Sequence, residues 1–117
     1  MTTHRRERVE SLIHQEISTI LARKVSDPRV QGVHVVSVQV SPDFHLARVN
    51  YSSMYDNLDM DSVQEGLDHA KPFIRNGLKK NLKLRVLPEL AFFYDPSIKH
   101  GDHILELLRT LAPKDEK

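Results

Sequence analysis

The sequence predicts one α+β domain, built in the order helix, strand, strand, helix, broken helix, strand and short last helix. Three observations support this class. The chain has 117 residues, which is the length of a single domain. Its apolar residues recur at helical spacing in some segments and at strand spacing in others. The two clearest strands follow one another directly instead of alternating with helices, which is typical of α+β proteins.

The first half of the chain is expected to form a helix followed by a hairpin. Residues 5–23 carry apolar side chains at helical spacing, namely Val9, Leu12, Ile13, Ile17, Ile20 and Leu21. Asp27 and Pro28 end this helix, because a residue that precedes proline disfavours helical backbone angles. The β-branched runs 33–40 and 44–53 flank a Ser-Pro-Asp turn, so they are expected to pair as antiparallel strands.

A second helical pattern is expected from a capping box at residues 62–65 to about residue 82. Its apolar face consists of Val63, Leu67, Ala70, Ile74 and Leu78. Proline lacks a backbone donor and crowds the carbonyl four residues earlier. A break or kink is therefore expected at Ala70, Lys71 and Pro72.

The remainder is expected to form one strand and one helix. Residues 84–94 alternate as a strand does, and Pro88 among them indicates an edge position or a bulge. Residues 102–111 have the apolar spacing of a short helix, so the domain is expected to span residues 1–111. Residues 112–117 are expected to form a frayed tail. No apolar stripe is left over once the core is assigned, which favours a monomer.

Composition argues against several classes of site. The sequence contains no cysteine, which excludes disulfides, thiolate nucleophiles and cysteine-based zinc sites. Its seven histidines are not arranged at the spacing of metal ligands, so no metal and no other cofactor is expected. The sequence has neither a long apolar run nor an apolar leader at its start. We therefore expect a cytoplasmic protein without a membrane span.

The strongest functional signal is a local excess of positive charge. The formal net charge is only +1, but residues 71–85 contain basic residues and no acidic one. These basic residues are Lys71, Arg75, Lys79, Lys80, Lys83 and Arg85. Positions 71, 75, 79 and 83 are spaced by four, so an intact helix would line them up on one face. Such a ridge suits the phosphate groups of RNA, with Arg29 and the arginines at positions 5, 6 and 8 as secondary contacts.

Other interpretations of these residues stay open. The letters "RVQGV" from Arg29 to Val33 match the centre of the phosphate loop of acylphosphatases, which would indicate a small hydrolase that uses Arg29. The context differs, because Pro28 stands where that pattern has glycine and Val36 stands where it has a second arginine. A turn after a helix is the simpler interpretation. The basic ridge is also compatible with a solvated face or with an acidic protein partner, and most of the aromatic residues are expected in the core.

Several stretches of the chain, taken in order, match one known family. They are "RVESLIHQEISTIL" (8–21), "DPRVQGVHVVSVQVSPD" (27–43), "ARVNYS" (47–52), "GLDHAKPFIRNGL" (66–78), "LRVLPELAFFYD" (84–95) and "HGDHILELL" (100–108). By these stretches the chain resembles the ribosome-binding factor A family. The resemblance implies a type II KH-like fold. It also implies a non-enzymatic protein that binds the free small (30S) ribosomal subunit and its 16S rRNA and assists the maturation of that rRNA, with no small-molecule substrate.

The resemblance also points to the region around Pro72. KH domains generally clamp a nucleic-acid backbone with a GxxG loop between two helices, and this sequence contains no such motif. The family has an Ala-x-Gly pattern at an interrupted helix instead. The corresponding residues are Ala70, Lys71 and Pro72, so proline stands where the family has glycine.

Overall fold

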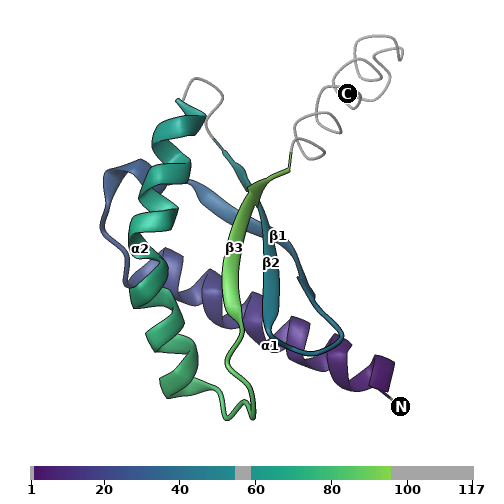
Figure 1. The fold of residues 1–117 in the computed structure, drawn as a ribbon. Helices are drawn as coiled ribbons and strands as arrows, with labels where there is room; N and C mark the ends of the chain where they lie inside the picture. Colours follow the sequence, from purple (N-terminus) through teal and green to yellow (C-terminus); the bar gives the residue numbers. More distant parts are fainter. Residues whose placement is uncertain (1, 55–58, 96–117) are drawn as a thin grey trace, which may run out of the picture.

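The structure is a computed structural model that describes residues 2–54 and 59–95, and it confirms the α+β class. The elements follow one another as α1 (Thr2–Arg23), the short 3-10 helix η1 (Pro28–Val30), β1 (Val33–Val40), β2 (Leu46–Ser53), α2 (Met60–Asn81) and β3 (Glu89–Tyr94). α1 packs against β1 and α2 packs against β3 (Figure 1). The helix predicted at residues 102–111 lies outside the described residues.

The three strands form one sheet in the order β1-β2-β3. β1 and β2 pair in antiparallel fashion, from Val33 opposite Ser53 to Val40 opposite Ala47, which confirms the predicted hairpin. A register shift near the middle of β1 marks a β-bulge, which bends the strand. β3 lies parallel to β2 at the edge of the sheet, because α2 carries the chain back before β3 begins.

One hydrophobic core lies between the two helices and one face of the sheet. The buried residues of β2 include Ala47, Val49 and Tyr51, as the alternation predicted. The predicted apolar face of α2 is buried as well. Leu12, however, was predicted on the buried face of α1 and is 38% exposed. It lies about 100° of helical rotation from its neighbour Ile13 and therefore outside the buried stripe.

A polar link ties α2 to the sheet beneath it. The Tyr51 hydroxyl donates a hydrogen bond to Gln64 Oε1 at 2.6 Å, and Gln64 Nε2 donates to the carbonyl of Phe92 at 3.0 Å. Burial raises the pKa of Tyr51 to about 12, so the phenol stays a neutral donor. One side chain of α2 thereby contacts both β2 and β3 and fixes the helix over them.

The start of α2 differs from the prediction. The capping box expected at residues 62–65 is wrong, because the helix begins at Met60. Asp59 is the N-cap, and its carboxylate accepts a hydrogen bond from the backbone N–H of Asp61 at 3.1 Å. Gln64 therefore lies beyond the first residues of the helix, where it is able to face Tyr51.

The predicted break in the same helix is also absent. α2 runs as a single helix through Ala70, Lys71 and Pro72. Proline removes one helical donor, and it leaves the carbonyl of Asp68 without its usual partner. Pro72 lies on the exposed side of α2, where water can serve that carbonyl, while Ala70 and Ile74 on the opposite side are buried. Packing of the apolar face therefore holds the helix together across the proline.

β3 is shorter than predicted. The strand begins at Glu89, and Pro88 directly precedes it instead of interrupting its ladder. The carbonyl oxygens of Leu87 and Pro88 accept hydrogen bonds from Arg75 on α2. These backbone acceptors therefore face a helix side chain, and the residues before Glu89 form a connecting segment. The predicted edge position of the strand is confirmed.

Candidate nucleic-acid interface

The basic residues predicted to bind RNA lie on the C-terminal half of α2 and on the segment that links it to β3. Lys79 and Lys80 are exposed in the last turn of the helix, where the helix dipole favours cations. Lys83 and Arg85 are exposed in the linking segment. Because α2 ends before Lys83, the predicted ridge of four residues on one helix face is wrong in its last member. Lys79, Lys80, Lys83 and Arg85 nevertheless lie together around the C-terminal end of α2.

Two of the predicted contacts are engaged inside the protein. Arg75 donates from Nε to the carbonyl of Pro88 and from Nη2 to the carbonyl of Leu87, each at 3.0 Å. Its guanidinium also lies 3.4 Å from Glu89. Lys71 lies 3.7 Å from Asp68, one turn earlier on the helix. Arg75 therefore holds the linking segment against α2, and it is less available to an RNA phosphate than its exposed neighbours.

Arg29 is engaged even more closely. Its Nη2 lies 2.8 Å from Asp27 Oδ2 and its Nε donates to both carboxylate oxygens, while Nη1 lies 3.6 Å from Glu65 on α2. These hydrogen bonds hold the pKa of Asp27 at about 2 and raise the pKa of Arg29. Asp27 also caps η1 by accepting from the backbone N–H of Arg29 at 2.9 Å. The stretch "SDPRVQG" is thus a capped turn.

Gly66 explains why this turn lies so close to α2. A Cβ atom at Gly66 would stand 2.9 Å from the Cβ of Arg29 and 3.0 Å from the Cγ1 of Val30. The absence of a side chain lets η1 pack directly on the helix. Since two carboxylates already surround the guanidinium of Arg29, a phosphate at this position would have to displace Asp27. The geometry therefore gives no support to an acylphosphatase-like use of Arg29.

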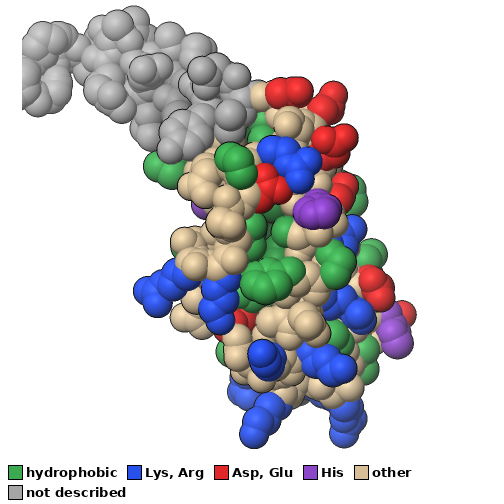
Figure 2. Space-filling view, turned by 90° about the vertical axis from the view of Figure 1, so that its left-hand side faces the viewer, with side chains coloured by type: hydrophobic (Ala, Val, Ile, Leu, Met, Phe, Trp, Pro, Cys, Tyr) green, Lys and Arg blue, Asp and Glu red, His purple; other side chains and the backbone are tan. Residues whose placement is uncertain are grey.

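Charged side chains are segregated along the face that α2 presents. Figure 2 shows acidic side chains mainly toward the end where α2 begins and Lys or Arg side chains toward the end where it finishes. Within residues 2–54 and 59–95, Lys79, Lys80, Lys83 and Arg85 form no ion pair with an acidic residue. We call these four residues the basic end. Their charge is therefore available to an anionic partner.

An N-terminal arginine reaches the same region. The guanidinium of Arg5 lies 5.4 Å from the ring centre of Phe44, and Arg5 and Arg85 line one small pocket together with Phe44, Leu84 and Val86. The fold therefore brings the start of α1 to the segment after α2, although about 80 residues separate them in the sequence. This proximity supports the prediction that the N-terminal arginines extend the basic surface.

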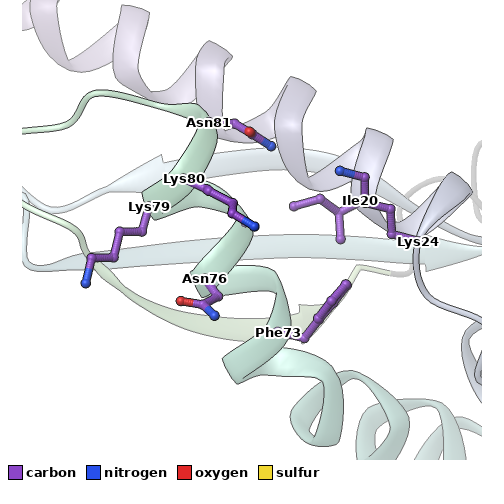
Figure 3. A pocket seen from close by; sticks show the side chains of 8 residues that line it. Ile20, Lys24, Phe73, Asn76, Lys79, Lys80 and Asn81 are labelled. Carbon is purple, nitrogen blue, oxygen red and sulfur yellow. The ribbon is translucent and has the colours of Figure 1, made fainter.

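A pocket between α1 and α2 was not foreseen from the sequence. It has a volume of about 410 Å³ and is lined by Ile20, Lys24, Phe73, Asn76, Gly77, Lys79, Lys80 and Asn81. Phe73 is 51% exposed, so it is not among the aromatic residues that lie in the core. The helical spacing contained the signal, because position 73 falls outside the apolar series 63, 67, 70, 74 and 78. Figure 3 shows the Phe73 ring projecting from α2 toward Ile20 and Lys24.

The described parts of the chain contain neither a membrane span nor a metal-binding cluster. Neither α1 nor α2 is apolar enough over a sufficient length to cross a bilayer. Residues 2–54 and 59–95 contain no group of three or more His, Cys, Asp or Glu side chains that could hold a metal ion.

Comparison with known proteins gives this surface its context. The family model described as ribosome-binding factor A matches residues 5–108, which is most of the chain. The chain belongs to the ribosome-binding factor A family. The Streptococcus mutans ribosome-binding factor A is 45% identical over 116 residues, a match that covers 98% of this chain and all of the relative.

Known structures of ribosome-binding factor A proteins have the same fold as this chain. The crystal structure of the Thermus thermophilus protein matches with a TM-score of 0.68 at 19% identity and covers 76% of this chain and 93% of that one. A homology model of the same Thermus protein, fitted into a cryo-EM map of a 30S complex, matches with a TM-score of 0.64 at 19% identity over 76% and 93% of the two chains. The fold is KH-like, although the sequence lacks a GxxG loop.

Proposed function

We propose that this chain binds the small ribosomal subunit through its 16S rRNA and assists maturation of that subunit without catalysing a reaction. The observation that carries the proposal is membership of the ribosome-binding factor A family over residues 5–108, together with a Thermus relative whose description places it in a 30S complex. Under this proposal we expect the protein to act in the cytoplasm, where ribosomes are assembled.

The basic end supplies the contact with RNA in this proposal. Lys79, Lys80, Lys83 and Arg85 are exposed and unpaired within the described residues, so they can neutralise phosphates without first losing an internal partner. Phosphate contacts of this kind position a protein on RNA and contribute little sequence specificity. Specificity then depends on the shape of the rRNA site. Arg75, Lys71 and Arg29 contribute less, because each is already paired.

Co-sedimentation with isolated small subunits, large subunits and full ribosomes over a salt series tests the function. We expect binding to small subunits alone, and we expect the logarithm of the affinity to fall linearly with the logarithm of the salt concentration. An absence of binding to small subunits at the lowest salt concentration would contradict the function itself.

A pair of single variants tests the surface separately. Lys79→Gln removes one charge from the basic end, and it should lower the salt slope by about one. Arg48→Gln removes one charge from β2 on the sheet face that the helices leave uncovered, where Arg48 lies 4.1 Å from the ring centre of Phe93. It should leave the slope unchanged. Equal effects of the two variants would show that the basic end is not the contact, even if the subunit still binds.

A further inference from the structure

The pocket between α1 and α2 combines features that the basic end alone does not have. Its lining residues include an exposed aromatic ring, two amide side chains and lysines, and none of them is acidic. Glu16 of α1 stands nearby, and its carboxylate accepts a hydrogen bond from Asn81 Nδ2 at 2.6 Å. Lysine side chains and an exposed aromatic ring therefore line the same space.

The depth of the pocket comes from the way the two helices meet. Gly77 faces Ile20, and a Cβ atom at Gly77 would lie 2.7 Å from the Cδ1 of Ile20. A glycine at this crossing lets the helices approach closely, because α2 adds no side chain of its own at position 77. Ile20 is 1% exposed and closes the floor with apolar surface. The volume of about 410 Å³ lies within the range of pockets that hold small planar ligands.

The walls of the pocket differ in chemistry. Phe73 offers a ring that is 51% exposed, next to the exposed amide of Asn76 one turn along α2. Lys80 lies on α2 and Lys24 directly follows the end of α1, and neither pairs with an acidic group in the described chain. Figure 3 shows Lys80 and Asn76 on the side of the pocket opposite Lys24, while Lys79 extends away from it. A planar ring with hydrogen-bonding edges, attached to phosphates, would match all three groups.

We propose that this pocket binds one unstacked base of single-stranded RNA. In this arrangement the base stacks on Phe73, its edge meets the amide of Asn76, and the flanking phosphates meet Lys24 and Lys80. Stacking on an aromatic side chain tolerates any base, because every base has a π-face. The inference rests on the proposed function, since it names the feature of the RNA that the protein would recognise beside the phosphate contacts. It predicts a preference for unpaired nucleotides over duplex.

Short oligonucleotides test the pocket independently of the ribosome. The probes are the ribotetranucleotides U4 and A4 and an abasic tetranucleotide with the same phosphates. We expect the full chain to bind the base-bearing probes about 5- to 150-fold more tightly than the abasic probe, which corresponds to one stacked base. Methyl resonances of Ile20 should shift with the base-bearing probes and stay in place with the abasic one.

Three variants separate stacking from charge and from folding. Phe73→Leu keeps an apolar side chain but removes the ring, and it should abolish the preference for base-bearing probes while leaving affinity for the abasic probe unchanged. Phe93→Leu changes the other exposed phenylalanine, which is 41% exposed on β3, and it should keep the preference. Lys80→Gln should weaken binding of all probes equally.

The outcomes distinguish the two proposals. If the wild-type chain sediments with small subunits but shows no preference for bases, or if Phe73→Leu keeps that preference, the base pocket is wrong and the proposed function stands. If only a protein of the subunit, and no probe, shifts the Ile20 resonance, the pocket is a protein contact and the base proposal is overturned. Failure to sediment with small subunits contradicts the function whatever the probes show.

Discussion

Asp27 supports the turn after α1 through a carboxylate that must stay ionised. Hydrogen bonds from Arg29 hold its pKa at about 2, below the ordinary value of 3.8. An acid whose pKa is depressed in the folded state contributes stability above its unfolded pKa, and that contribution is lost as the pH falls through the folded pKa. Asp27 therefore contributes fully above about pH 4, and its contribution disappears as the pH falls from there to about 2.

Asp27→Asn isolates this contribution, because the amide oxygen can still cap η1 but carries no charge. We expect the variant to be less stable than the wild type at neutral pH, and we expect the difference to vanish between about pH 4 and pH 2. Urea unfolding over that range measures it. The pKa of Asp43, which hydrogen bonds from Ser41 and His45 also depress, affects both proteins equally and cancels in the difference. A difference that stays constant down to pH 2 would contradict the assignment.

Gly66 gives a second prediction for a single residue. Alanine normally stabilises a helix relative to glycine by about 0.5–1 kcal/mol. At this position the new methyl group would press on the Cβ of Arg29 and on Val30, and overpacking of this kind costs about 1–3 kcal/mol. We therefore expect Gly66→Ala to lose about 1 kcal/mol of unfolding free energy in urea.

Gly77→Ala is the matched control for Gly66→Ala. There the methyl group meets the tip of Ile20, which borders the pocket and can rotate into it. The control should therefore lose less stability than Gly66→Ala. A Gly66→Ala protein more stable than the wild type would mean that η1 is not seated on α2 in solution.

At the scale of elements, Arg75 shows how a basic residue can belong to the fold. It joins α2 to the carbonyls of Leu87 and Pro88 just before β3. Each hydrogen bond to a charged group contributes about 1.5–3 kcal/mol when buried, and less at this half-exposed position. We expect Arg75→Gln to lose about 1–2 kcal/mol of unfolding free energy and to bind RNA, once folded, nearly as well as the wild type.

Lys79→Gln should show the opposite pattern. This lysine has no partner among the described residues, so its loss should change stability by less than about 0.5 kcal/mol while it weakens RNA binding. Urea unfolding and oligonucleotide binding, measured on both variants, show which of the two residues serves folding and which serves RNA binding. Equal losses of RNA affinity with no change in the stability of Arg75→Gln would assign Arg75 to the interface instead of to the fold.

The spacing of apolar residues in the sequence predicted helices and strands correctly where residues close in the sequence determine them. The hairpin follows from two β-branched runs around a turn, and the buried face of α2 follows from its apolar series. The break at Pro72 and the start of β3 were predicted wrongly, because both depend on distant partners. Burial of the flanking face overrides the proline, and the Arg75 side chain occupies the carbonyls that a longer strand would have used.

In the candidate site, too, features that depend on residues distant in the sequence could not be predicted. The run of basic residues could be read directly from the sequence, but their availability could not. Asp27 neutralises Arg29 from only two positions away, yet the orientation of both side chains depends on the packing of η1 against Gly66. The pocket needed both helices in place, because Ile20 and Phe73 are far apart in the sequence. Charge was therefore predictable, whereas pairing and shape were not.

At the scale of the whole molecule, the segregation of charge matters more than its total. Asp61 and Glu65 lie near the start of α2, about 20–28 Å along the helix from Lys79 and Lys80 at its end. This distance exceeds the screening length of about 8 Å at physiological salt. Acidic residues at one end therefore do little to weaken the attraction of RNA to the other end.

Two double variants test this distinction between local and total charge. Asp61→Asn with Glu65→Gln removes two negative charges and so raises the formal net charge from +1 to +3. Lys79→Gln with Lys80→Gln removes two positive charges and so lowers it from +1 to −1. We expect the first pair to change affinity for small subunits less than about 2-fold at physiological salt, because its site lies beyond the screening length. The second pair should lower the salt slope by about two. The opposite result would be an affinity that follows net charge, in which removing the two acidic residues raises the affinity as much as removing the two lysines lowers it. Binding would then be governed by the overall charge of the protein, and the basic end would not be the docking surface.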